Sequence, residues 1–320
     1  MYDGFIIQDK MKNNKKYDGN TSKFGITVDK VDYIVKTAKT EISSVFSEHV
    51  ASRFIRGIGI TCHETWLGWY NGELAVILKD FTSGTSFQLK SYKDTEQSSE
   101  GTDLSNKIYS YDDVLRMISK HTKMSDLNKQ KAIIRFWDMF ICDAILGNRD
   151  RHHGNWGYII TDKGYIPAPI YDNGGSLFPD ISKRIREYDN AVVNGKELMF
   201  IADRAEKFPA SLFRLKRQDG TSRRTNYNEI LSDLRMNKTM AREVKAVREK
   251  VGFNRVYETI IRIMIDAKEI IPADYRRFYV MIVCVRYLHL IERKDIKNSY
   301  RMTYRRLQNE TRNWVRIREP

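Results

Sequence analysis

A short polar segment, "GNRDRHHGNWG" at residues 147–157, contains an acid, several basic side chains and two asparagines. Within it, Asp150 and Asn155 stand in the order D-x-x-x-x-N. A protein-kinase catalytic loop uses this interval: its Asp orients the acceptor hydroxyl and takes the proton, and its Asn binds magnesium. The spacing alone is weak evidence, because an Asp and an Asn five residues apart occur by chance in most chains of this length.

A second acid, Asp172, lies in "IYDNGGS" at 170–176, directly after an apolar β-like stretch. In the same template, an Asp at such a position holds the magnesium ion that bridges the ATP phosphates. Carboxylate and amide oxygens are hard ligands that suit magnesium. A turn before the glycines would explain Asp172 on its own. Because it follows Asp150 and Asn155 in the right order, we predict Asp150 as the catalytic residue and Asn155 and Asp172 as magnesium ligands.

A lysine and a glutamate that fit the same chemistry occur earlier in the chain. "DYIVKTA" at 32–38 places Lys36 at the end of a hydrophobic strand, where lysines of the V-A-I-K type reach ATP phosphates. Glu48 lies between apolar positions on the next predicted helix, as does the helix-borne glutamate that pairs with this lysine in kinases. Singly, each would be read as a solvated charge. Together with the downstream acids, they predict a catalytic Lys36–Glu48 pair.

The loop ahead of Lys36, "YDGNTSKFG" at 17–25, is polar and has a glycine near each end. Such a loop can fold its backbone amides over phosphates. It matches neither G-x-G-x-x-G nor the Walker A motif, and a plain turn between strands would also explain it. Its position before the lysine strand favours nucleotide contacts at Ser22 and Lys23.

The elements around these residues predict an α+β chain with two lobes. Residues 24–38 indicate a β-hairpin broken at Asp29 and Lys30, and apolar residues at helical spacing predict a helix from about 41 to 57. The stretch 64–81 contains Asn71-Gly72 between apolar segments, which is typical of a hairpin. We expect a β-rich first lobe with one helix over residues 1–91.

The polar stretch 92–105 predicts a linker or loop, followed by a larger helical lobe over 106–320. Ser125 or Asp126 is expected to cap a helix that ends at Gly147-Asn148, so that the polar segment follows a buried helix. Two short β-like stretches then lead into "DNGGS", and helical patterns dominate after about residue 195.

Composition is that of a folded globular protein: of 320 residues, 41% are hydrophobic and 30% charged. The formal charge of +14 resides in the C-terminal third, because residues 201–320 hold 28 Lys and Arg against 15 Asp and Glu. This excess would attract nucleic acid, an anionic membrane or an acidic protein, and a solvated basic helical surface explains it equally well.

The three cysteines lie far apart, with no CxxC spacing, which argues against a disulfide framework or a zinc site and fits a reducing compartment. The N-terminus has no apolar signal-peptide core. The strongest apolar run, 278–285, is far shorter than the roughly 20 residues that span a bilayer. We expect a soluble, cytoplasmic protein. Secretion or translocation by a route that needs no signal peptide stays open as an alternative.

The strings "FSEHVA", "LKDF", "FWDMFICDAILGNRDRHHGNWG" and "PIYDNGGS" occur in the order shown by the HipA-like kinase family, and the chain most resembles its cell-translocating kinase A type. The resemblance covers residues 17–180 well and the helical remainder loosely. It implies a two-lobed protein-kinase-like fold that binds Mg-ATP in the cleft and phosphorylates serine or threonine on a protein.

The resemblance also assigns roles to residues by position. It implies Asp150 as the catalytic residue, Asn155 and Asp172 as metal ligands, Lys36 as the phosphate-contacting lysine and His152 as a cleft residue near the phosphates. It further implies adenine contacts from the backbone of Lys79 and Phe81, autophosphorylation at Ser22 or, second to it, Thr21, and an antitoxin-like regulator of the kind that restrains some family members.

Some positions depart from eukaryotic-type kinases: Asn148 replaces the His of H-R-D, and no A-P-E follows Asp172. Two alternatives stay open. One is a catalytically silent kinase-like scaffold whose basic C-terminal third binds nucleic acid or an acidic protein. The other keeps the chemistry but transfers phosphate to a lipid or small molecule, because a catalytic constellation does not define its substrate.

Overall fold

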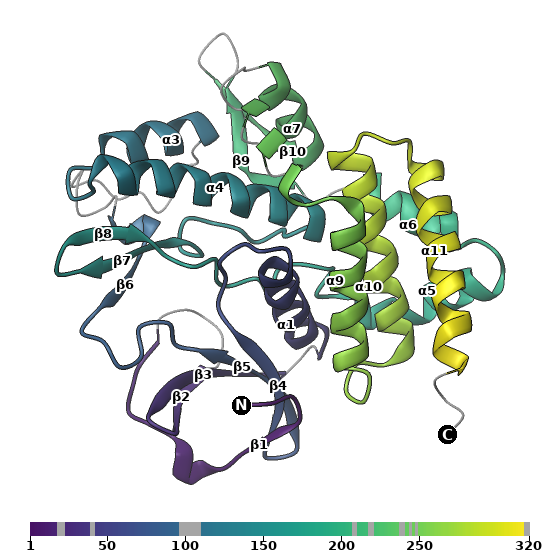
Figure 1. The fold of residues 1–320 in the computed structure, drawn as a ribbon, viewed down its shortest axis with the longest axis horizontal. Helices are drawn as coiled ribbons and strands as arrows, with labels where there is room; N and C mark the ends of the chain where they lie inside the picture. Colours follow the sequence, from purple (N-terminus) through teal and green to yellow (C-terminus); the bar gives the residue numbers. More distant parts are fainter. Residues whose placement is uncertain are drawn as a thin grey trace.

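The computed structural model describes residues 1–17, 23–38, 42–95, 110–206, 210–216, 221–236, 241–242, 245–246 and 249–316. The first lobe is one five-stranded sheet with a helix against it (Figure 1). The strands lie in the order β1-β4-β5-β3-β2; β1 pairs with β4 in parallel, and the other neighbours are antiparallel. Their bounds, with those of the helix, are β1 (Phe5–Ile7), β2 (Lys23–Val28), β3 (Val31–Thr37), α1 (Ile42–Gly57), β4 (Thr65–Tyr70) and β5 (Glu73–Lys79).

Both expected hairpins of this lobe are present. Asp29 and Lys30 join β2 to β3 with φ values of 51° and 65°, and Asn71 and Gly72 join β4 to β5 with 50° and 78°. A two-residue hairpin turn with positive φ at both positions matches the twist of the paired strands, and Asn-Gly adopts it readily. The α1 helix begins and ends close to the bounds that its apolar spacing predicted.

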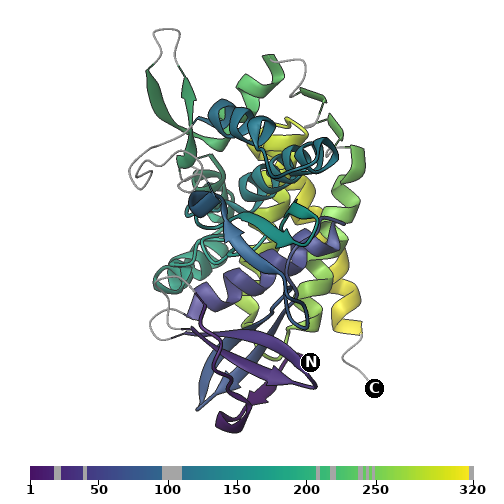
Figure 2. The same ribbon diagram turned by 90° about the vertical axis from the view of Figure 1, so that its left-hand side faces the viewer.

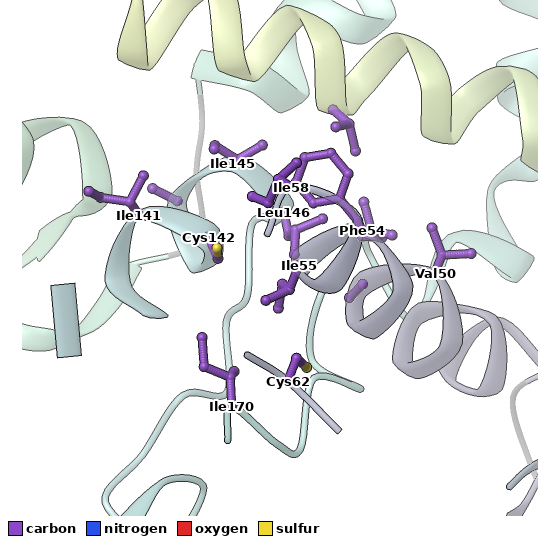
Figure 3. Packing of buried hydrophobic residues seen from close by; sticks show 14 of the residues in the cluster. Val50, Phe54, Ile55, Ile58, Cys62, Ile141, Cys142, Ile145, Leu146 and Ile170 are labelled. Carbon is purple, nitrogen blue, oxygen red and sulfur yellow. The ribbon is translucent and has the colours of Figure 1, made fainter. Parts of the chain in front are cut away.

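The sheet has two apolar faces. The outer face packs with β1 and the residues after it, around Ile7, Ile26, Val35 and Ile77. The other face packs against α1. Phe54 and several neighbouring side chains of α1 belong to the same apolar cluster as the core of the second lobe. Figure 3 shows this junction, where side chains of α1 meet those of the long helix α4. The labelled members of this cluster are Val50, Phe54 and Ile55 from α1, Ile58 directly after it, and Ile141, Cys142, Ile145 and Leu146 from α4. This shared apolar cluster therefore fixes the position of α1 relative to the second lobe.

The second lobe is mainly helical. Its long helices α9, α10 and α11 lie side by side, and α4 crosses the middle of the molecule (Figures 1 and 2). The helices are α3 (Tyr111–Lys120), α4 (Asp126–Leu146), α5 (Ile185–Val193), α6 (Glu197–Glu206), α7 (Tyr227–Met236), α9 (Phe253–Asp266), α10 (Ala273–Arg286) and α11 (Ile296–Arg316), with short helical turns at Asp9–Met11, Ile181–Lys183 and Tyr287–Ile291. None of the helices in the described ranges is long and apolar enough to cross a membrane.

Strand pairing places β6 (Gln88–Ser91) with the second lobe, where it pairs with β7 (Gly157–Thr161), the neighbour of β8 (Gly164–Pro167). We expected the polar segment 92–105 to connect the lobes, but this pairing favours a crossing at residues 80–87, between β5 and β6. Residues 96–109 of the polar segment lie outside the described part of the chain.

A second hairpin, β9 (Ala210–Lys216) with β10 (Ser222–Asn226), lies in the region where helical patterns led us to expect helices. Its short strands carry several charged residues, so little apolar alternation marks them in the sequence. Phe213 of β9 is buried against Phe136 and Phe140 of α4. Tertiary packing on α4 therefore supports this hairpin.

Candidate active site

The polar loop at 147–157 is held by the end of α4. Ser125 caps the start of this helix by accepting the Asn128 N–H. Gly147 ends it in the left-handed conformation, with φ at 67°, as the sequence predicted. Only glycine fits there, since a Cβ would also collide with the Arg286 guanidinium. The conformation of Gly147 therefore fixes the direction in which the polar loop leaves α4.

A buried ion pair shapes the loop from below. Arg151 donates from Nε to Asp143 Oδ2 at 2.8 Å and from Nη2 to Asp143 Oδ1 at 3.1 Å, and both side chains are only 1% exposed. Nη1 of Arg151 donates to the carbonyls of Asn155 and Tyr171, each at 2.6 Å. One guanidinium thus joins α4, the polar loop and the strand-like segment that precedes Asp172.

Asn148, which replaces the histidine of H-R-D, adds a second brace. Its Nδ2 donates to Asp143 Oδ1 at 3.0 Å, and its Oδ1 accepts the Asp150 N–H at 3.0 Å. Gly175 packs against this loop so closely that a Cβ would lie 2.6 Å from Asn148 Oδ1 and 2.7 Å from Asp150 Cβ. The backbone of Asp150 is therefore fixed on two sides.

The side chains of Asp150 and Asn155 face different surroundings. The Asp150 side chain is exposed, and within the described residues its carboxylate makes no hydrogen bond. Asn155 is buried, and its Nδ2 donates to the Asp150 carbonyl at 2.8 Å. This bond orients the amide, and no described residue donates to its Oδ1. One group is available to a substrate and the other presents an oriented oxygen.

Lys36 lies between two carboxylates, as a bridge between the lobes. Its Nζ is 2.9 Å from Glu48 Oε2 on α1 and 2.8 Å from Asp172 Oδ1. Burial opposes charge on both members of the Lys36–Glu48 pair, but Glu48 and Asp172 together raise the pKa of Lys36, and Lys36 lowers the pKa of Glu48. Both groups therefore stay charged at neutral pH. Asp172 itself has a positive φ of 58°.

Asn173 connects the first-lobe residues Glu48 and Ser52 to Arg151 of the polar loop, through its backbone N–H and both polar atoms of its side chain. Its backbone N–H donates to Glu48 Oε1 at 2.8 Å, and its Oδ1 accepts from Arg151 Nη2 at 2.6 Å. Its Nδ2 donates to Ser52 Oγ at 2.9 Å and Cys62 Sγ at 3.3 Å. Kinases of the D-F-G type have a phenylalanine here. In this chain a buried polar residue links the Lys36–Glu48 pair to the polar loop.

Sequence reasoning missed Arg151, Asn173 and the residues beneath them. His63 lies 3.2 Å from Glu48 Oε1 and 2.7 Å from Ser52 Oγ, and it too is buried. A usable signal was the pair of acids inside the apolar helix "FWDMFICDAIL", because a buried acid requires a partner. The partner, Arg151, stands beside Asp150 in the polar loop.

The other predicted site residues are less closely gathered. His152 is exposed, and its Nδ1 accepts the Gly154 N–H at 3.0 Å. Lys23 opens β2 directly opposite Lys36 in the strand register. Phe81 follows β5, with its ring 6.2 Å from that of Tyr171. Ser22 and Thr21 lie outside the described residues.

Lys79 contributes to the sheet rather than presenting a free amide. Its N–H donates to the Glu64 carbonyl at 2.9 Å, and its Nζ lies 3.4 Å from Glu64 Oε1. The Lys79 N–H is therefore not available to donate to adenine. No acceptor in the described ranges takes the Phe81 N–H, which makes Phe81 the better placed of the two.

His153 packs beneath the polar loop and is a titratable group. Its ring packs beside Tyr92, which stacks on Trp156 with ring centroids 4.2 Å apart. Burial, aided by the charge of His152, lowers the pKa of His153 to about 4. Trp156 is thus a packing residue, and His153 is neutral at physiological pH.

This pKa predicts acid sensitivity. In the unfolded chain His153 is protonated below about pH 6.5, whereas in the folded protein it is protonated only below about pH 4. Because the unfolded state binds the proton first, the free energy of unfolding should fall as the pH falls between these values. A His153→Phe variant should show a dependence shallower by up to about 1.4 kcal/mol per pH unit. Urea unfolding between pH 4 and 7 measures both slopes. Equal slopes would contradict the assignment.

The small sheet carrying Lys36, the helix carrying Glu48 and the helical lobe carrying Asp150 and Asp172 define a protein-kinase-like fold. A family model described as the HipA-like C-terminal domain matches residues 7–251, most of the chain. The chain therefore belongs to the HipA-like family.

Two comparisons identify its relatives. The chain is 30% identical over 224 residues to the serine/threonine-protein kinase CtkA of Helicobacter pylori strain J99, an alignment that covers 67% of this chain and 62% of that protein. It thus spans less than two thirds of that relative's length. The crystal structure of a Helicobacter pylori proinflammatory kinase CtkA matches with a TM-score of 0.74 and 24% identity, over 94% of this chain and 98% of that one. This structure shares the fold.

Proposed function

We propose that the protein transfers phosphate from Mg-ATP to serine or threonine of a protein. The observation that carries the proposal is the position of Lys36, 2.9 Å from Glu48 and 2.8 Å from Asp172, above a loop whose Asp150 carboxylate is exposed. The CtkA relative is a serine/threonine-protein kinase, which supports the acceptor class.

The residues proposed for the metal have the chemistry that magnesium needs. Asn155 presents an oriented amide oxygen, and the Asp172 side chain, 41% exposed, presents a carboxylate. The described residues contain no group of three His, Cys, Asp or Glu side chains arranged for a metal. Magnesium commonly takes one or two carboxylates together with substrate phosphates and water. When bound, it would neutralise charge on the transferring phosphate.

The protein's own groups would supply position and charge. Lys36, held by Glu48, places a fixed positive charge where the phosphates would lie, and it would exchange Asp172 for phosphate oxygen. Asp150 would accept a hydrogen bond from the incoming hydroxyl, orient it and receive its proton. Phosphoryl transfer depends on such positioning more than on covalent chemistry.

The remaining contacts belong to the same proposal. Phe81, on the connector, would bind the base through its backbone, while Ser22, Lys23 and His152 would lie toward the phosphates. Autophosphorylation at Ser22 and an antitoxin-like regulator are proposals that rest on the family resemblance. A cytoplasmic location is a proposal that rests on the cysteine pattern, which fits a reducing compartment.

The experiment is incubation of the full chain with Mg-ATP and candidate acceptor proteins, read by mass spectrometry of every protein present. We expect phosphate on serine or threonine, and complete loss of labelling when excess EDTA removes the metal. Addition of magnesium beyond the EDTA should restore it. Phosphate on an added lipid or small molecule in place of protein would redirect the acceptor class. No label on any acceptor, with ATP unconsumed, would refute the proposal.

A scaffold that binds polyanions is the second candidate, favoured by one observation. Lys297, Arg301 and Arg305 are exposed at four-residue spacing along α11, which places them on one face of the helix. This reading expects polynucleotide binding that weakens steeply with salt, with no ATP turnover. A charged helix face is equally compatible with solvent, so the kinase proposal remains the better supported.

A further inference from the structure

The segment before β2 lies against the face of the sheet that carries Lys36. Residues directly opposite one another in an antiparallel pair point to the same face, and Lys23 is opposite Lys36, Gly25 opposite Ile34 and Thr27 opposite Asp32. Gly25, Thr27 and Asp32 therefore share the face of Lys36, which is the side turned toward α1 and the second lobe.

Residues 12 and 13 pair with the edge of β2, and the side chains of Asn13, Lys15 and Tyr17 reach over this face. The Asn13 N–H donates to the Gly25 carbonyl at 3.0 Å, and its side chain donates to Thr27 Oγ1 at 2.9 Å and Asp32 Oδ1 at 3.3 Å. Lys15 Nζ lies 2.7 Å from Asp32 Oδ2. The segment is thus anchored along the strands at one end of the face.

Its far end is fastened to the connector between the lobes. Asp80, which is 8% exposed, accepts from the Tyr17 hydroxyl at 3.1 Å and from Lys15 Nζ at 3.2 Å. The same carboxylate accepts the N–H and hydroxyl of Thr82 at 2.8 and 2.6 Å. Asp80 is next to Phe81, so Tyr17 is held beside the residue expected to bind the base.

The Asn13 side chain and, next to it, the Tyr17 ring occupy the space that a side chain at Gly25 would fill. A Cβ on Gly25 would lie 3.1 Å from Tyr17 Cε2 and would collide with Asn13 Oδ1. Gly25 is two residues along β2 from Lys23, the partner of Lys36, so it lies about 6.6 Å from the level of the lysine. The ring therefore sits away from the phosphate-binding lysine and toward the connector.

We propose that Tyr17 forms part of the wall of the nucleotide-base pocket, with its ring against the base and Asp80 as its anchor. This inference rests on the proposed ATP-dependent function and adds a base-contacting residue to it. An aromatic ring suits the task because every base presents a flat face on which to stack. The absence of a side chain at Gly25 leaves room for the ring against the sheet, and the Asp80 contacts restrict its motion.

The test measures binding to the full chain of two probes, Mg-ATP and inorganic tripolyphosphate, which lacks the base. For Tyr17→Ala we expect about tenfold weaker binding of ATP, equivalent to about 1.4 kcal/mol, with tripolyphosphate affinity unchanged within twofold. Tyr17→Phe keeps the ring and should lose less than about threefold. Tyr2→Ala, at a tyrosine 66% exposed in the same lobe, is the matched control and should change neither affinity.

Three outcomes would overturn the inference alone. They are equal loss of both ligands in Tyr17→Ala, unchanged ATP binding, and tighter ATP binding, the last of which would mean that the ring blocks the pocket. Thermal unfolding of each variant without ligand shows whether the fold is retained. If Tyr17→Ala is unstable, Tyr17→Phe keeps the test valid, because the Phe variant should bind ATP with near wild-type affinity. A wild-type protein that binds neither probe would instead refute the proposed function.

Discussion

Replacing Asp150 with asparagine is expected to lower phosphoryl transfer about 10³-fold, since a positioned acid-base group contributes roughly 10²–10⁴-fold to such reactions. The fold should survive, because the side chain is exposed and its carboxylate makes no hydrogen bond to described residues. Asparagine keeps the size of the side chain and removes its basicity. The measurement is the initial rate of phosphate incorporation from labelled Mg-ATP, beside the melting temperature of each protein.

Asp162→Asn is the matched control, because Asp162 is an exposed acid in the turn between β7 and β8. It should have wild-type activity. ATP affinity in Asp150→Asn should also stay within a few fold of wild type, because Asp150 is assigned to the acceptor hydroxyl. Near-normal transfer by Asp150→Asn would remove Asp150 from the mechanism.

The largest expected effect on stability comes from Arg151→Met. This change leaves Asp143 buried with its main partner lost, and breaking a buried ion pair in this way costs about 3–5 kcal/mol. The carbonyls of Asn155 and Tyr171 lose their donor as well. Urea unfolding followed by circular dichroism measures the loss in free energy of unfolding.

Two further variants separate the contribution of the pair from that of the loop. Arg149→Met removes the arginine two residues earlier, which is 45% exposed and 3.4 Å from Asp180, and should cost less than about 1 kcal/mol. Adding Asp143→Leu to Arg151→Met removes the orphaned charge and should recover part of the stability. Phosphate transfer should stay low in this double variant, because the loop bearing Asp150 has lost its brace. Equal losses in Arg149→Met and Arg151→Met would contradict the buried-pair interpretation.

Sequence alone was sufficient wherever the signal was local. The turns at Asp29-Lys30 and Asn71-Gly72 require residues that tolerate positive φ, and Gly147 marks the end of α4 for the same reason. Helix periodicity placed Glu48 on the strand-following helix, and this put it within reach of Lys36. Such features depend on a few neighbouring residues, so a single chain reveals them.

Only the tertiary structure decided which distant groups meet. Asn173 gave no sign of its role in the sequence, yet it bonds to Glu48, Ser52 and Arg151, which lie up to 125 positions away. Tyr17 gave no sign of its contact with Asp80, 63 residues away. Hydrogen bonds of this kind carry no periodicity, and a polar residue has the same letter whether it is solvated or buried. Burial between two lobes selects the partner, because a buried polar group is costly unless it is bonded.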